Sequence, residues 1–162
     1  MAMLAAGILK ILNKRLPKVI SPRAHAVIDY ATAGAFFMMA AMLWKRNRRA
    51  AFGALMSGAG EAATAAFTSF PGGLVDAISF ETHGKVDAAL SGLVATLPNM
   101  LDFEDDKAAA FFRTQAILMG GVTAMTDFGG DIADEESSAD REEADVGEGD
   151  WEGSRGRWRR AS

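Results

Sequence analysis

Two histidine–aspartate pairs are the residues of this chain best suited to chemistry. His25 is followed four positions later by Asp29, and His83 is followed four positions later by Asp87. On an α-helix this spacing places the imidazole and the carboxylate on one face, one turn apart. Two imidazoles and two carboxylates are a ligand set for Zn²⁺ or another divalent ion, and two histidines can also ligate haem iron.

The same two pairs also have a purely structural interpretation. A carboxylate in the first turn of a helix complements the positive helix end, and a histidine can hydrogen-bond a neighbouring connection. We favour this role over metal binding, haem binding or proton transfer, because no other part of the chain has ligand spacing. We therefore expect no cofactor, and the pairs stay candidate metal ligands only.

Glu61 and Arg113 are further candidates, because each lies inside an apolar stretch. A charge placed in lipid is costly and marks a functional position by default, so a buried bridge between the two is one hypothesis. The alternatives are a hydroxyl-paired or solvent-facing glutamate, and an arginine that extends to the membrane surface. No nucleophile elbow, phosphate loop, dinucleotide fingerprint or zinc-protease motif occurs, and we expect no enzymatic activity.

The segments that carry these residues form an internal repeat. A shift of 58 residues superposes His25 on His83 and Asp29 on Asp87, without a gap. Within residues 20–130 it also superposes twelve further identical pairs, among them Ile20/Ile78, Ser21/Ser79, Gly34/Gly92, Thr68/Thr126 and Phe70/Phe128. This indicates a two-helix unit in tandem, with repeats at 20–73 and 74–130.

The apolar stretches predict helices that cross a membrane. They cover 26–44, 50–70, 86–101 and 108–126, and they carry mainly Ala, Gly, Ser and Thr between the large side chains instead of a polar stripe. Each is close to the roughly 20 residues that span a hydrocarbon core. Small residues allow close helix contact in lipid, and we expect Gly34 and Gly92 to mark such a contact in each repeat. A soluble four-helix bundle is the alternative.

A gapless repeat of two helices gives both copies the same orientation, with a pseudo-two-fold axis along the membrane normal. Both histidines then face one side, and the loops KRNRR (45–49) and FEDDK (103–107) meet on the other. Their opposite charges predict attraction between the two halves. Basic residues flank both ends of the first span, so the sequence leaves the sidedness open.

The ends of the chain differ from its middle. Residues 1–19 predict an amphipathic helix at the membrane interface. Residues 131–162 are rich in Asp, Glu, Gly and Ser, end in a basic cluster and account for much of the net charge of −4. Such a composition predicts a disordered tail. The chain has no cysteine, which excludes disulfides and thiol chemistry.

The segment ISPRAHAVIDYATAG, its repeat ISFETHGKVDAALSG and the following TLPNMLDFEDDKAAAF resemble the bacterial SPW-repeat integral membrane proteins. The resemblance covers residues 20–128. The tripeptide that names the family is replaced here by Leu97, Pro98 and Asn99, and by Ala40, Ala41 and Met42 in the first copy. The resemblance implies a small four-span bacterial membrane protein and brings no site residue with it.

The sequence thus predicts an all-α, four-helix transmembrane bundle made of two tandem helical hairpins. We expect a multi-pass protein of the bacterial inner membrane, serving as a scaffold or accessory subunit. Its expected partners are the lipid bilayer and either further copies of itself or a larger membrane complex, with no nucleic acid. The alternative is a metal-binding, haem-binding or transport protein that uses the His/Asp pairs and Glu61.

Overall fold

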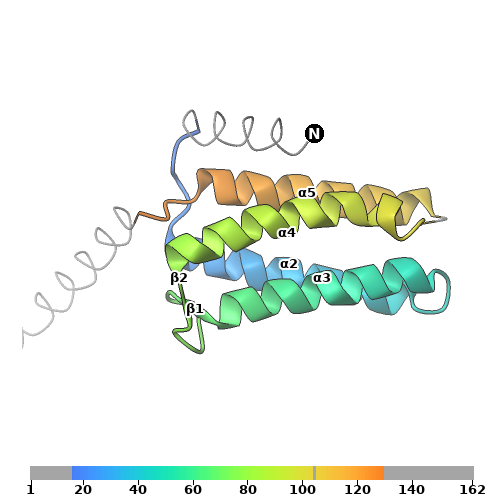
Figure 1. Cartoon of the computed structure of the whole chain (residues 1–162), viewed down its shortest axis with the longest axis horizontal. Coiled ribbons are helices and arrows are strands. Elements are labelled where there is room, and N and C mark those ends of the chain that lie inside the picture. The colour runs from blue at the N-terminus through green and yellow to red at the C-terminus, as the bar shows by residue number, and fades with distance from the viewer. Residues whose placement is uncertain (1–15, 104, 130–162) are drawn as a thin grey trace, which may run out of the picture. The chain divides into compact units, whose positions relative to one another are not determined.

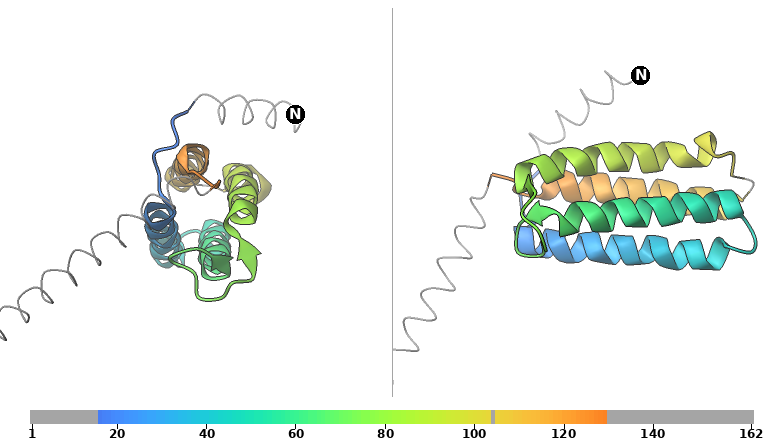
Figure 2. Two further views of the ribbon diagram at one scale, coloured as in Figure 1. Left: turned by 90° about the vertical axis from the view of Figure 1, so that its left-hand side faces the viewer. Right: turned by 60° about the horizontal axis from the view of Figure 1, so that its bottom comes forward.

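The computed structural model describes residues 16–103 and 105–129. In this part of the chain four helices follow one another: α2 (Pro22–Leu43), α3 (Arg48–Ala66), α4 (Phe80–Met100) and α5 (Asp106–Met125). They form a four-helix bundle in which α2 packs on α3 and α4 packs on α5, with α3 against α4 (Figures 1 and 2). The all-α prediction is confirmed. The tail predicted at 131–162 and most of the helix predicted at 1–19 lie outside the described residues.

Equivalent residues of the two repeats begin the helices. Ser21 caps α2 and Ser79 caps α4, each accepting a hydrogen bond from the backbone N–H three residues on. Asn47 and Asp105 stand at equivalent positions and cap α3 and α5 in the same way. A side-chain oxygen at this position satisfies one of the backbone donors that a helix start leaves without a partner. The two repeats therefore share not only their helices but also the N-cap residues that set where each helix begins.

The second helix is shorter than the sequence predicts. The apolar stretch runs to residue 70, but α3 ends at Ala66, and Thr68–Ser69 form the short strand β1. Strand β1 pairs in parallel with β2 (Ile78–Ser79), with Thr68 opposite Ile78. The helix ends here because the carbonyl oxygen of Phe67 accepts hydrogen bonds from the backbone N–H groups of Ala77 and Ile78, at 3.1 and 3.0 Å, instead of from a later residue of the same helix.

The repeat relation extends to this pairing. The equivalent of Thr68 in the second repeat is Thr126, and the equivalent of Ile78 in the first repeat is Ile20. Thr126 and Ile20 also pair, in a parallel β-bridge. The N–H of Ile20 donates to the carbonyl of Met125 at 3.1 Å, as Ile78 does to Phe67. In both places the residue before the first helix of one repeat pairs with the residues that follow the last helix of the other. The two hairpins are therefore tied together twice at one end of the bundle.

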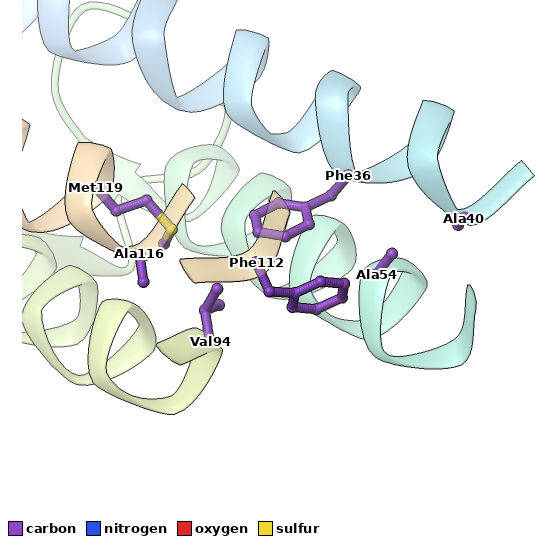
Figure 3. Close-up of a cluster of buried hydrophobic side chains, with 7 residues drawn as sticks. All are labelled: Phe36, Ala40, Ala54, Val94, Phe112, Ala116 and Met119. Atoms are coloured by element: carbon purple, nitrogen blue, oxygen red, sulfur yellow. The ribbon is translucent and has the colours of Figure 1, made fainter. Parts of the chain in front are cut away.

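The centre of the bundle is held by complementary large and small side chains (Figure 3). Phe36 and Phe112 are fully buried and meet edge to face, with ring centroids 5.7 Å apart. Their repeat equivalents are the smaller Val94 and Ala54, which are buried in the same cluster. Large and small residues at equivalent positions thus share one core, and edge-to-face aromatic pairs add stability beyond their buried area.

The close contact of the first hairpin lies at a different glycine from the one expected. A Cβ on Gly34 or Gly92 would meet no atom within 4 Å, so neither marks a close crossing. A Cβ on Gly58 of α3 would lie 3.1 Å from the carbonyl oxygen of Ala33 on α2. Gly34 and Gly92 are exposed, because they stand one position after the buried Ala33 and Ser91.

Candidate functional site

The two His/Asp pairs come together inside one end of the bundle. His25 and Asp29 lie in the first two turns of α2, and His83 and Asp87 lie in the first two turns of α4. The exposed fractions of His25, Asp29, His83 and Asp87 are 0%, 3%, 1% and 3%. One ligand atom from each of the four lies within 4.8 Å of the others. The parallel repeat brings them together because it starts α2 and α4 at the same end.

The two imidazoles face each other through the same ring nitrogen. His25 Nε2 lies 3.1 Å from His83 Nε2. Asp87 Oδ2 lies 3.0 Å from His25 Nε2 and 2.9 Å from His83 Nε2. Asp29 reaches both rings with different oxygens, Oδ1 at 3.3 Å from His25 Nε2 and Oδ2 at 3.1 Å from His83 Nε2. Every carboxylate contact of the pair therefore converges on the two Nε2 atoms.

Two threonines fix the protonation of the opposite ring nitrogens. Thr68 Oγ1 donates its only proton to the carbonyl of Thr64 at 2.6 Å, and Thr126 Oγ1 donates to the carbonyl of Val122 at 2.7 Å. Each hydroxyl can then only accept from the imidazole beside it. His83 Nδ1 lies 2.8 Å from Thr68 Oγ1, and His25 Nδ1 lies 2.7 Å from Thr126 Oγ1. Both Nδ1 atoms therefore carry a proton, which leaves Nε2 as the free acceptor of each neutral ring.

Our reading of the sequence for chemistry missed Thr68 and Thr126 as site residues. Their signal was present, because they coincide under the 58-residue shift. The hydrogen-bond partners are exchanged between the repeats. Thr68 of the first repeat accepts from His83 of the second, and Thr126 of the second repeat accepts from His25 of the first. Sequence comparison identifies such a pair as equivalent, but only the packing of the hairpins says which histidine each threonine contacts.

Aromatic rings cover the cluster. Phe80 and Phe128 lie edge-on to His25, with ring centroids at 5.5 and 5.4 Å, and Phe70 lies 5.3 Å from His83. Phe80 contacts both of the other phenylalanines, at 5.3 Å from Phe70 and 4.7 Å from Phe128. These rings separate the imidazoles from solvent, and a low dielectric strengthens every electrostatic interaction beneath them.

Glu61 of α3 lies beside the cluster. Its side chain is 4% exposed, and its Oε2 has no hydrogen-bond partner. It lines a cavity of about 10 Å³ together with His25, Asp29, Asp87 and Met119. This volume admits about one water molecule. Met119 is the repeat equivalent of Glu61, so the two halves of the site differ at this position.

The hypothesis of a bridge between Glu61 and Arg113 is wrong for this structure. Arg113 is exposed on α5, and no ion pair joins it to Glu61 in the described part of the chain. The repeat explains the outcome: Arg113 is equivalent to Leu55, which is 38% exposed, whereas Glu61 is equivalent to the buried Met119. Glu61 therefore lies on the buried face of α3, whereas Arg113 lies on the exposed face of α5.

Among the described residues, one contact between opposite charges joins the loops at the far end of the bundle. Arg49 Nη1 lies 3.3 Å from Asp102 Oδ2, with side chains that are 61% and 89% exposed. Asp102 stands next to the acidic loop and has a positive φ of 49°. The attraction predicted between the two loops is thus represented by an exposed pair, and such pairs contribute at most about 1 kcal/mol.

Comparisons with known protein families, with curated proteins and with solved structures found no match. The chemistry of the site is therefore argued from its geometry. The buried nitrogens and carboxylates can hold protons or a metal ion. They cannot hold a haem between the histidines, because axial ligands lie on opposite faces of a porphyrin, whereas the two Nε2 atoms are 3.1 Å apart beside a one-water cavity.

Proposed function

We propose that this chain is a small integral membrane protein of four spans, without enzymatic activity, that serves as a scaffold or accessory subunit of a membrane assembly. The observation that carries the proposal is the distribution of polarity. Beside its apolar core, the bundle buries the charged side chains of Asp29, Glu61 and Asp87, and it exposes many large apolar side chains. Buried charged groups and extensive exposed apolar surface are both uncommon in proteins folded in water.

The exposed apolar residues are found on all four helices. They include Val27, Met38 and Met42 on α2, Phe52 and Met56 on α3, Leu93 and Met100 on α4, and Ile117 and Leu118 on α5, with exposed fractions from 46% to 76%. Exposed apolar surface on this scale marks contact with a membrane or another protein. Surrounding lipid would solvate these side chains, and further copies of the chain could cover part of them.

Helix length supports the same proposal. The four helices have 22, 19, 21 and 20 residues. At about 1.5 Å per residue they match the roughly 30 Å thickness of a hydrocarbon core. Among the described residues, α2 alone passes a test for a membrane span by length and composition. The other helices carry more small and polar residues; several of the polar ones, Ser57, Glu61, Asp87 and Ser91, are buried inside the bundle, whereas Arg113 and Thr114 on α5 are exposed.

A role without catalysis fits the form of the site. The His/Asp cluster is buried beneath aromatic rings, and the cavity beside it, of about 10 Å³, admits no organic substrate. The resemblance to the SPW-repeat membrane proteins adds a bacterial inner membrane as the proposed location. The transport alternative would need a continuous polar path, and the cavity that Glu61, its proposed carrier, lines in the described part of the chain has a volume of about 10 Å³.

The test is the behaviour of the full-length chain in cells and after purification. We expect it to stay in the membrane fraction after carbonate extraction and to require detergent for release. Crosslinking in those membranes should give a discrete oligomer or complex. A well-dispersed monomer in buffer that contains no amphiphile would contradict the proposal.

A further inference from the structure

We propose that His25, Asp29, His83 and Asp87 bind a divalent metal ion, with Zn²⁺ as the best-fitting one, and that this ion joins the two hairpins. The inference begins with the two facing Nε2 atoms, 3.1 Å apart. Since the Nδ1 protons are committed to Thr68 and Thr126, two neutral rings would point lone pairs at each other. Two protonated rings could each donate to an aspartate, but they would hold two like charges 3.1 Å apart. A cation held between the two ring nitrogens and the carboxylates satisfies all four side chains without that repulsion.

The charge of the site favours a divalent ion over one shared proton. Asp29 and Asp87 are 3% exposed. Among the described residues, Asp87 Oδ1 has no hydrogen-bond partner, and Asp29 Oδ2 has only its ion-pair contact with His83 Nε2. A single proton would leave one of the two buried aspartate charges uncompensated, and an uncompensated buried charge is strongly unfavourable. A divalent ion neutralises both carboxylates, and it can provide a partner for Asp87 Oδ1.

The distances match a tetrahedral site. The face formed by His25 Nε2, His83 Nε2 and Asp87 Oδ2 has edges of 3.1, 3.0 and 2.9 Å. Asp29 can supply the fourth ligand, since its Oδ1 lies 3.3 Å from His25 Nε2 and its Oδ2 lies 3.1 Å from His83 Nε2. Ligands bound at about 2.0 Å in a regular tetrahedron lie about 3.3 Å apart. One ligand atom from each of the four side chains lies within 4.8 Å of the others, so the Asp29 carboxylate must turn or shift to complete the shell around the ion.

The ligand types select among metals. Imidazole nitrogen with carboxylate oxygen suits Zn²⁺ and related transition ions, whereas Ca²⁺ and Mg²⁺ prefer oxygen ligands alone. The chain has no cysteine, so the soft thiolate ligands that favour Cu(I) or iron–sulfur clusters are absent. Four protein ligands would fill a tetrahedral Zn²⁺ shell completely, which is the form of a structural centre and not of a catalytic one.

The surroundings have the features of a built metal site. A metal-ligating histidine nearly always donates its other N–H to an oxygen, and Thr126 and Thr68 accept those bonds here. Each hairpin supplies one His/Asp pair, together with the threonine that orients the histidine of the other hairpin. The bound ion would therefore link α2 to α4 and strengthen the same end of the bundle that the two β-pairings already tie.

The test uses the full-length chain, purified in detergent through an affinity tag that contains no histidine. After chelation and removal of the chelator, it is titrated with Zn²⁺ and, separately, with Co²⁺. We expect one ion per chain, displacement of Co²⁺ by Zn²⁺, and the intense visible absorption of tetrahedral Co²⁺. A helical protein that takes up no Zn²⁺, or that gives only the weak spectrum of octahedral Co²⁺, would overturn the proposal.

Variants locate the ion. Asp29→Asn and His83→Gln should abolish the tetrahedral Co²⁺ spectrum. Asp102→Asn, the same change at an exposed carboxylate, should leave it intact. If a ligand variant fails to fold, Thr126→Val and Thr126→Ser give a second measure. Loss of the accepting hydroxyl in Thr126→Val should weaken Zn²⁺ binding about 10- to 100-fold, and Thr126→Ser should restore it. Equal affinity in all of these variants would overturn the assignment.

Discussion

His25 donates from Nδ1 to the hydroxyl of Thr126, 2.7 Å away and 101 residues later in the chain. The repeat-equivalent contact, from His83 Nδ1 to Thr68 Oγ1, is 2.8 Å long and crosses only 15 residues. The same histidine–threonine hydrogen bond is thus formed once between residues far apart in the chain and once across a short connection. These two bonds orient both imidazoles, and they are the contacts on which the arrangement of the cluster depends.

Removal of either threonine hydroxyl should destabilise the fold. In Thr68→Val and Thr126→Val a buried Nδ1–H loses its acceptor, and we expect each change to cost about 1 to 3 kcal/mol. The free energy of unfolding, measured by denaturant titration in detergent, checks this. Thr96→Val is the matched control, because Thr96 is exposed and its hydroxyl bonds only to its own helix. A large loss in the control, with none at Thr68 or Thr126, would contradict the role given to the two hydroxyls.

The central ring of the bundle should contribute far more stability than an outward-facing one. Phe112 has no exposed surface, whereas Phe52 is 54% exposed. We expect Phe112→Ala to lower the free energy of unfolding by about 3 to 5 kcal/mol, since it removes buried apolar contacts and leaves a cavity. In detergent, Phe52→Ala should have a much smaller effect. Similar losses from the two variants would show that Phe112 is not at the centre of the packing.

The charge contact between the loops should add little. Reversal of Arg49 to Glu replaces an attraction with Asp102 by a repulsion, and we expect a loss of about 1 kcal/mol or less at low salt. Thermal unfolding in detergent at two salt concentrations measures it, and the loss should shrink at high salt because both side chains are exposed. A larger, salt-independent loss would mean that this contact has a more than electrostatic role.

The proposed membrane topology can be tested with single cysteines, because the chain has none of its own. Leu74, 82% exposed, lies in the connection at the end that holds the His/Asp cluster, and Asp102 lies at the opposite end. In sealed vesicles a membrane-impermeant maleimide should label Leu74→Cys and Asp102→Cys from opposite sides. Met38→Cys, in the middle of α2, should be protected until the membrane is dissolved. Equal labelling of all three in intact vesicles would contradict a spanning bundle.

Removal of the proposed metal ion should lower the melting temperature. An ion that binds only the folded chain stabilises it by about 2.7 kcal/mol when its free concentration is 100 times its Kd. A chelator should therefore shift the thermal transition of the wild-type protein downwards, and added Zn²⁺ should restore it. The Asp29→Asn variant should respond to neither addition. A wild-type transition that is indifferent to both additions would count against a metal that joins the hairpins.

The sequence permits prediction of much of this architecture, because a duplication records which residues are equivalent. It predicts the all-α class, four apolar stretches that lie in the four helices, and both His/Asp pairs at the same end. The end of α3 was harder to place, since its apolar run continues beyond Ala66 and only the pairing of Thr68 with Ile78 stops the helix. Apolar composition alone does not distinguish a helix end from a strand that a distant segment completes.

Tertiary structure alone decided how each helix is rotated about its axis. Helices that are apolar on most faces carry no strong stripe to say which side is buried. The sequence therefore left several arrangements open for Glu61 and Arg113, and the close contact expected at Gly34 and Gly92 was wrong. Packing turned Glu61 towards the cluster and Arg113 outwards, and it brought the two Nε2 atoms within 3.1 Å of each other. The i, i+4 spacing follows from the chain itself. The two His/Asp pairs come into contact only when the two hairpins pack together. His25 and His83 are 58 residues apart, so their contact depends on packing between the hairpins and not on the local sequence around either residue.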